Sequence, residues 1–161
     1  MENNLWGSLE DVKCGIRNPK DILEEQADFL REGLDGLVRG SVMRGTVADA
    51  WRDFYNGLGV SDAFVYYFRI ISDYVEKYEY EAFKIAYGVK LYPLAISFGG
   101  EVNSELESQF VVEDGDTIVV ENEEEFYKVL KGIFSTNELR QVLKGLVSMA
   151  SKEKESSDFP F

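Results

Sequence analysis

The chain has 161 residues, of which 45% are hydrophobic and 14% are aromatic, which excludes a disordered protein and favours one globular domain. Thirty Asp and Glu against 17 Lys and Arg give a formal net charge of −13, a field that repels nucleic acids and anionic membranes. The chain contains no His, which excludes the commonest general base and the Ser-His and Cys-His nucleophile pairs. We therefore expect a protein that binds neither nucleic acid nor membranes directly.

The cysteine content and the two ends of the chain bear on its compartment. Cys14 is the only cysteine, which excludes an intramolecular disulfide and a cysteine-rich zinc site. Residues 1–11 lack the basic start and apolar run of a secretory signal, and no apolar stretch approaches the ~18 residues of a membrane span. These features predict a cytoplasmic protein with a flexible N-terminus at 1–14, one domain at 15–150 and a flexible tail at 151–161.

The first predicted element is a helix. Asn18-Pro19 places an N-capping side chain directly before a proline in the first helical position. Apolar residues then recur at helical spacing from Ile22 to Leu34. The helix is expected to end near Gly33 or Gly36.

The middle of the chain contains runs of β-branched and aromatic residues that predict strands. In one run the apolar residues fall on both faces, which indicates a central strand. Another contains Pro93, which predicts an edge position or a bulge. The predicted strands are Leu37 to Val47, Phe64 to Ile71 (the central strand), Tyr78 to Tyr87 and Leu91 to Phe98, with residues 48–62 interpreted as a short helix or a loop insertion.

A further hairpin is predicted near the C-terminal third. Asp114-Gly115 supplies the positive φ of a tight turn between Phe110–Val112 and Ile118–Val120. Residues 99–107 are interpreted as an insertion without an assigned conformation.

Two helices are predicted to close the chain. Asn122 with Glu125, and Ser135 with Glu138, are spaced as capping boxes, and an apolar stripe follows each. The element order predicts an α+β fold: an antiparallel meander sheet of about five or six strands, with the N-terminal helix and the two C-terminal helices packed on one face.

Negative charge is concentrated in one segment. Between residues 90 and 128 there are ten Asp and Glu and no Lys or Arg. If this segment were extended, alternate residues would lie ~6.6 Å apart on one face. Glu105 with Glu107, and Glu121 with Glu123, would then hold carboxylates at about the spacing of backbone phosphates.

The leading hypothesis is a non-enzymatic acidic protein that binds and inhibits a basic, nucleic-acid-binding protein. Such a protein would act as a nuclease inhibitor, immunity protein or phage anti-defence protein does, by nucleic-acid mimicry. Aromatic side chains would supply lasting contacts, and no cofactor or metal is expected. The expected contact residues are Glu105, Glu107, Glu113, Asp114, Asp116, Glu121, Glu123, Glu124, Trp51, Tyr55, Phe159 and Phe161.

Three other interpretations stay open. The carboxylates could form an ordinary solvated face, with those before the first C-terminal helix complementing its dipole. The protein could instead be a regulatory or structural module that uses the aromatic face of its sheet or forms a homodimer through Trp51, Phe54 and Tyr55.

The third interpretation is a metal-dependent enzyme. Asp73, Glu79, Glu81 and two lysines lie near one turn, although the sequence has no Asp-x-Asp-x-Asp-Gly loop.

Two sets of residues resemble known groups. The first is similar to small uncharacterised bacterial and mobile-element proteins and implies an architecture but no activity. It comprises Ile22-Leu23, Gln26-Ala27, Leu30, Leu37-Val38, Gly40, Tyr92-Pro93, Glu123–Phe126 and Ile133–Ser135.

The second set is the end of the chain. Asp158-Phe159-Pro160-Phe161 resembles the acidic tip of bacterial single-stranded DNA-binding proteins, whose terminal Pro-Phe docks into pockets on repair and replication enzymes. One aspartate stands here where that family has several. This resemblance implies a docking device on a flexible tail.

Overall fold

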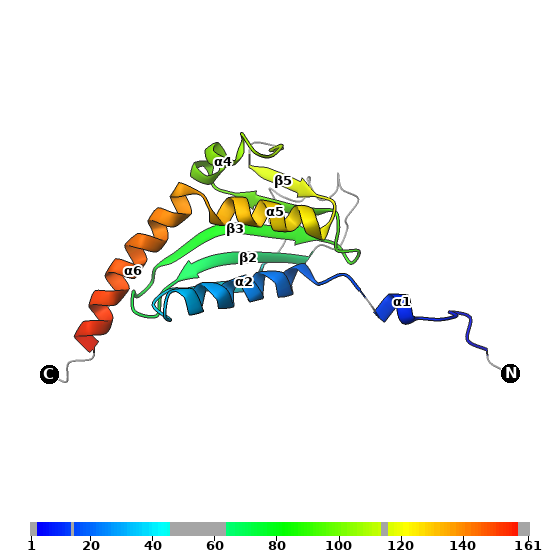
Figure 1. The fold of residues 1–161 in the computed structure, drawn as a ribbon, viewed down its shortest axis with the longest axis horizontal. Helices are drawn as coiled ribbons and strands as arrows, with labels where there is room; N and C mark the ends of the chain where they lie inside the picture. Colours follow the sequence, from blue (N-terminus) through cyan, green and yellow to red (C-terminus); the bar gives the residue numbers. More distant parts are fainter. Residues whose placement is uncertain (1–2, 14, 46–63, 114–115, 158–161) are drawn as a thin grey trace.

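The fold is that of a computed structural model, which describes residues 3–13, 15–45, 64–113 and 116–157. Five strands form one antiparallel sheet in the order β1-β2-β3-β4-β5, and two helices, α2 and α5, lie across one face of it (Figure 1). The predicted α+β meander is confirmed. The elements are α1 (Glu10–Lys13), α2 (Pro19–Gly33), β1 (Arg39–Gly45), β2 (Phe64–Ile71), β3 (Glu79–Tyr87), β4 (Leu94–Phe98), α4 (Gly100–Leu106), β5 (Thr117–Val120), α5 (Glu123–Phe134) and α6 (Asn137–Ser157).

Helix α2 begins where the sequence predicts. The Asn18 side chain accepts a hydrogen bond from the Lys20 N–H at 3.1 Å, and Pro19 occupies the first helical position. The apolar stripe is buried against the sheet, with Ile22 and Leu23 fully inaccessible. This stripe fixes which side of α2 faces the core.

A glycine in β1 allows α2 to pack closely on the sheet. A Cβ atom at Gly40 would lie 2.8 Å from Phe68 Cζ and 2.9 Å from Ala27 Cβ, closer than real Cβ contacts come. The pairing of β1 with β2 runs without a register shift, whereas β2 and β3 shift between Phe68 and Arg69. Gly40 therefore marks a close helix–strand approach and not a bulge.

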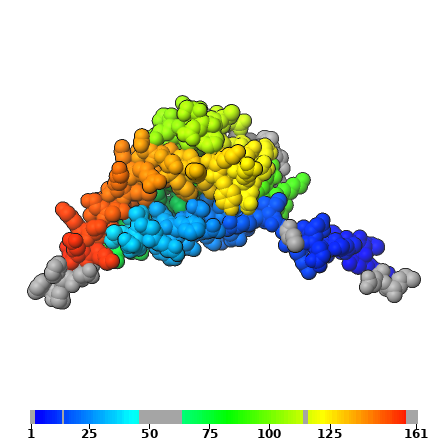
Figure 2. Space-filling view, viewed as in Figure 1, coloured from blue at the N-terminus to red at the C-terminus, as the bar shows by residue number. Residues whose placement is uncertain are grey.

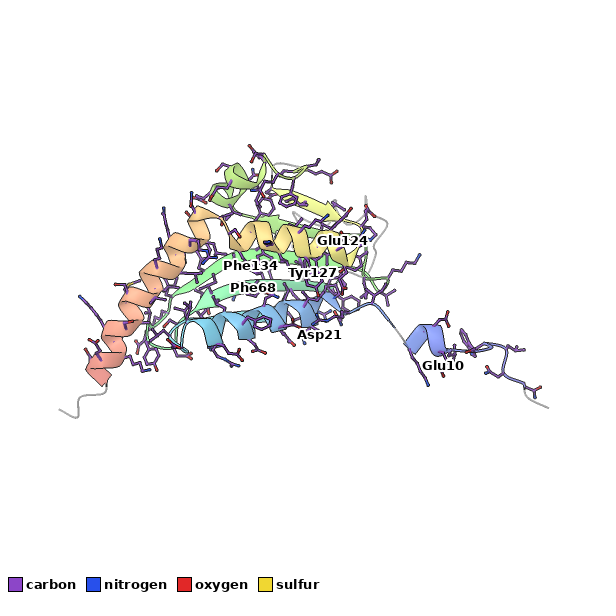
Figure 3. All side chains as sticks on the ribbon, in the orientation of Figure 1. Glu10, Asp21, Phe68, Glu124, Tyr127 and Phe134 are labelled. Atoms are coloured by element: carbon purple, nitrogen blue, oxygen red, sulfur yellow. The ribbon has the colours of Figure 1, made fainter. Side chains whose placement is uncertain are left out.

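The central strand prediction for β2 is confirmed in both bounds, and its aromatic residues organise the core. Phe68 pairs with Phe83 of β3, and their rings stack 5.2 Å apart. The ring of Phe134 from α5 tilts against both, at 5.5 Å and 5.9 Å (Figure 3). The core therefore lies between the sheet and the helices that cover it.

Strand β4 is an interior strand that pairs with both neighbours without a register shift, so the predicted edge position or bulge is wrong. It lies between β3 and β5, and all five of its residues are buried. Pro93 stands one residue before the strand begins, where its missing N–H interrupts no ladder hydrogen bond.

The predicted hairpin at Asp114-Gly115 is also wrong in its first arm. Residues 110–112 form no strand, and in the described part of this segment the pairing is one isolated bridge between Glu113 and Thr117. Phe110 packs instead on α5, where a Cβ atom at Gly132 would lie 2.8 Å from its ring. The packing of this half-buried ring against α5 accounts for the missing first arm, and the predicted turn residues Asp114 and Gly115 lie outside the described residues.

Helix α5 has the predicted cap. The Asn122 side chain accepts from the Glu125 N–H at 2.9 Å. In return, the Glu125 carboxylate accepts from the N–H of Glu121, at 2.7 Å, one residue before the position expected of a capping box.

Helix α6 starts differently from the prediction. Ser135 closes α5, and the first turn of α6 is capped by Thr136, whose hydroxyl accepts from the Leu139 N–H at 3.3 Å. The helix then continues to Ser157, through part of the predicted tail. The fully buried side chains of the described residues end at Ala150, the predicted end of the domain.

No helix within the described ranges is both long enough and apolar enough to traverse a lipid bilayer.

Candidate functional site

The acidic segment, between residues 90 and 128, includes the edge strand β5 of the sheet. After β4, the chain forms α4 and then returns to β5, which is the last strand in the sheet order. In the space-filling view, residues 100–113 form a crest at the top of the molecule (Figure 2). Three of the predicted acidic contacts, Glu105, Glu107 and Glu113, thus belong to this crest, and none of those that the structure describes lies within one of the five strands.

The strand spacing assumed for the carboxylates is wrong. Glu105 lies in helix α4 and Glu107 at its C-terminal cap, while Glu121 follows β5 and Glu123 begins α5. The regular phosphate-like repeat of an extended segment is therefore absent from these pairs.

Glu105 has a role within the fold. Its carboxylate accepts hydrogen bonds from the backbone N–H groups of Asn137 and Glu138, at 2.6 Å and 3.1 Å. These are two of the donors that the first turn of a helix leaves unpaired. Glu105 thus joins α4 to α6 and interacts favourably with the α6 dipole.

Two carboxylates at the start of α5 are paired or partly shielded from solvent. Glu124 forms an ion pair with Lys128 at 3.5 Å. Glu123 is half-buried, and its Oε1 atom is shielded from water with no hydrogen-bond partner. It lies near Tyr92, whose pKa is raised by burial and then by the Glu123 charge.

Five exposed carboxylates remain, and we call them the acidic edge. Asp116 accepts from the Thr117 hydroxyl at 2.9 Å, the one side-chain hydrogen bond found for this set in the described part of the chain. Within that part, none of the five forms an ion pair with Lys or Arg. The acidic edge consists of Glu101, Glu107, Glu113, Asp116 and Glu121.

Several carboxylates elsewhere on the molecule do have cationic partners. On α2, Glu24 pairs with Lys20 and Asp28 with Arg31. Each pair joins two residues about one helical turn apart. Such surface pairs contribute little stability but lower the local charge repulsion. The acidic edge therefore differs from α2 in how its charge is compensated.

An apolar residue that the sequence reasoning missed lies within the acidic edge. Val111 is 81% exposed, on the segment between α4 and β5. The hairpin prediction had placed this residue in a strand. Its exposure gives this segment of the chain an apolar side chain that a partner could contact.

Two of the tyrosines on the sheet are buried. Tyr66 and Tyr87 are 8% and 3% exposed and belong to the core. The Tyr87 hydroxyl donates to the Asn18 side chain at 2.7 Å, and burial raises the pKa of Tyr87 to about 12. The pKa of Tyr80 is likewise raised to about 12, by burial and then by the Glu138 charge.

Two of the carboxylates considered for a metal-dependent enzyme, Asp73 and Glu79, form ion pairs. Asp73 accepts two hydrogen bonds from the Arg39 guanidinium, both at 3.2 Å, and Glu79 pairs with Arg69 at 3.3 Å. Among the described residues, no three Asp, Glu or Cys side chains are grouped so that they could share a metal ion.

Five predicted contacts fall outside the described residues: Trp51, Tyr55, Asp114, Phe159 and Phe161. Phe54 of the predicted dimer contact lies outside them too.

No protein-family model, curated protein or solved structure gives a significant match to this chain.

Proposed function

We propose that this protein is a non-enzymatic inhibitor that binds a basic, nucleic-acid-binding protein through its acidic edge. The observation that carries this proposal is the set of five exposed carboxylates with no Lys or Arg partner in the described part of the chain. The partner would be a protein whose own ligand is a nucleic acid, such as a nuclease, since a cationic groove suits both.

Charge repulsion within the acidic edge supports a cationic partner. Like charges gathered in one region destabilise a protein, and a basic surface placed against them relieves that cost. Charge complementarity also speeds encounter and excludes partners of the wrong sign. Val111 would then supply an apolar contact beside these charges.

The test compares two variants with equal charge changes. The edge variant carries Glu107→Gln, Glu113→Gln, Asp116→Asn and Glu121→Gln. The matched control carries Asp21→Asn, Glu24→Gln, Asp28→Asn and Glu32→Gln, four exposed residues of α2. In the view of Figure 2, α2 lies below the crest.

The parent and the two variants are each immobilised and exposed to the heparin-binding fraction of a host-cell extract. The protein that the parent captures is then purified, and its affinity for the parent and for each variant is measured. We expect the edge variant to bind at least tenfold more weakly, and the α2 variant to bind within about threefold of the parent. A DNA or RNA oligonucleotide should displace the partner. Equal loss in both variants, or binding that nucleic acid leaves unchanged, would contradict the proposal.

A further inference from the structure

A second feature lies on the helical side of the molecule. A cavity of about 220 Å³ is lined by residues of α2, β2, α5 and α6 and is open to solvent on one side. Its floor is formed by Phe68 and Ile70, each 1% exposed, so it reaches the core. Phe29 of α2 and Leu143 of α6 stand on opposite elements that line it.

The cavity opens to solvent beside an exposed aromatic ring. Phe29 of α2 lines the cavity but is 57% exposed. Its neighbour Leu30, which also lines the cavity, packs against the core. An exposed large apolar side chain at the mouth of an apolar cavity is typical of a binding site.

One cationic side chain lines this mainly apolar cavity. Arg140 of α6 lies on its wall together with the Gln26 amide of α2. For Arg140, the described part of the chain contains no carboxylate or aromatic partner, although the protein has a net charge of −13. Other described arginines do have such partners: Arg17 with Glu25, Arg31 with Asp28, Arg39 with Asp73, Arg69 with Glu79, and Arg44 with the rings of Phe64 and Tyr66.

We propose that this cavity binds a small amphipathic carboxylic acid. Its apolar body would lie against Phe29, Phe134 and Leu143, and its carboxylate would accept hydrogen bonds from the Arg140 guanidinium. A planar guanidinium binds a carboxylate through two parallel hydrogen bonds, which is the recognition that an unpaired arginine offers.

The size of the cavity limits the ligand. An apolar cavity of roughly 150 Å³ accommodates benzene. A volume of about 220 Å³ therefore suits an apolar body of a medium-chain or single-ring acid. A second copy of this chain is a poorer occupant, because two molecules of net charge −13 repel each other.

The probe is octanoate, with 1-octanol as a neutral ligand of the same length. Binding to the full chain is measured by calorimetry at pH 7. We expect Arg140→Gln to weaken octanoate binding about tenfold and to leave 1-octanol binding within about twofold. Lys144→Gln is the matched control, because Lys144 is an exposed cation one turn along α6 that does not line the cavity, and we expect it to change neither affinity by more than about twofold.

A second pair of variants tests the location. Leu143→Trp fills the cavity from a half-buried position, whereas Leu143→Met conserves its volume. We expect the Trp variant, checked for folding by circular dichroism, to lose both ligands and the Met variant to retain them.

Three results would overturn the proposal. They are equal affinity for octanoate and 1-octanol, equal effects of the Arg140 and Lys144 substitutions, and octanoate binding by the folded Trp variant. A dimer that the Trp variant abolishes while octanoate does not bind would also overturn it, since a second copy would then occupy the cavity. The four-residue edge variant should bind octanoate like the parent, which separates this proposal from the inhibitor function.

Discussion

Gly40 shows how one residue sets the distance between two elements. A methyl group at this position would enter space that Phe68 and Ala27 already occupy. We expect Gly40→Ala to reduce the free energy of unfolding by about 1–3 kcal/mol, since overpacking forces the helix and strand apart. Urea unfolding followed by circular dichroism measures this change.

Gly145 provides the control for Gly40. It lies within α6, and a Cβ atom there would meet nothing within 4 Å. Gly145→Ala should therefore stabilise the protein, by roughly 0.5–1 kcal/mol, because alanine loses less backbone entropy in a helix. Effects of the same sign in both variants would contradict the packing explanation for Gly40.

Tyr87 links the core to the start of α2 and makes stability depend on alkaline pH. Its pKa is raised by burial from its ordinary value of about 10 to about 12 in the folded state. The unfolded chain therefore releases this proton first, so the stabilisation is complete below pH 10 and is lost as the pH rises towards 12. We expect Tyr87→Phe to flatten the fall in stability between pH 10 and 12.

The same substitution removes the hydrogen bond to Asn18. At pH 8 the variant should therefore be less stable than the parent, by about 1 kcal/mol. Urea titrations at pH 8, 10 and 11 separate the two effects. An unchanged slope above pH 10 would show that Tyr87 is not the group that titrates.

At the scale of the element, α6 depends on a carboxylate from another helix. Glu105 of α4 accepts from two N–H groups of its first turn. We expect Glu105→Ala to lower the free energy of unfolding by about 1–2 kcal/mol and to speed amide exchange at the start of α6. Glu107→Ala, an exposed substitution two residues away, should change stability by less than about 0.5 kcal/mol.

Elements with a strong apolar period were predictable from sequence. Helix α2 and strand β2 have the predicted bounds, and α5 has the predicted cap, because a local capping residue or a long apolar run specifies each. Helix α4 was not predicted, since it is short and begins at a glycine pair. Its conformation depends on burial of Val102 and Leu106, which local propensity does not reveal.

At the scale of the whole molecule, charge is compensated unevenly. Three carboxylates of α2, those of Glu24, Glu25 and Asp28, have cationic partners, whereas those of the acidic edge have none in the described part of the chain. We expect the four-residue edge variant to raise the melting temperature at low salt more than the α2 variant does, because two of the four carboxylates changed in the α2 variant, Glu24 and Asp28, have ion-pair partners that the substitutions remove.

Salt gives the matching test of this difference. Added sodium chloride screens exposed charges, so the melting temperature of the parent should rise between about 0.02 M and 0.3 M salt. The difference between the edge and α2 variants should shrink over the same range. Scanning calorimetry measures both, and a difference that salt leaves unchanged would assign the effect to packing.

The sequence alone determined the α+β class, the meander order, the start of α2 and the concentration of negative charge, because periodicity, caps and composition are local properties of the chain. Only the tertiary structure decided which carboxylates are exposed: it directed Glu105 to α6, paired Glu124 with Lys128 and left the acidic edge uncompensated. It also placed Arg140 beside an apolar cavity formed by four elements. These outcomes depend on contacts between segments far apart in the chain, and the order of residues does not specify their distances.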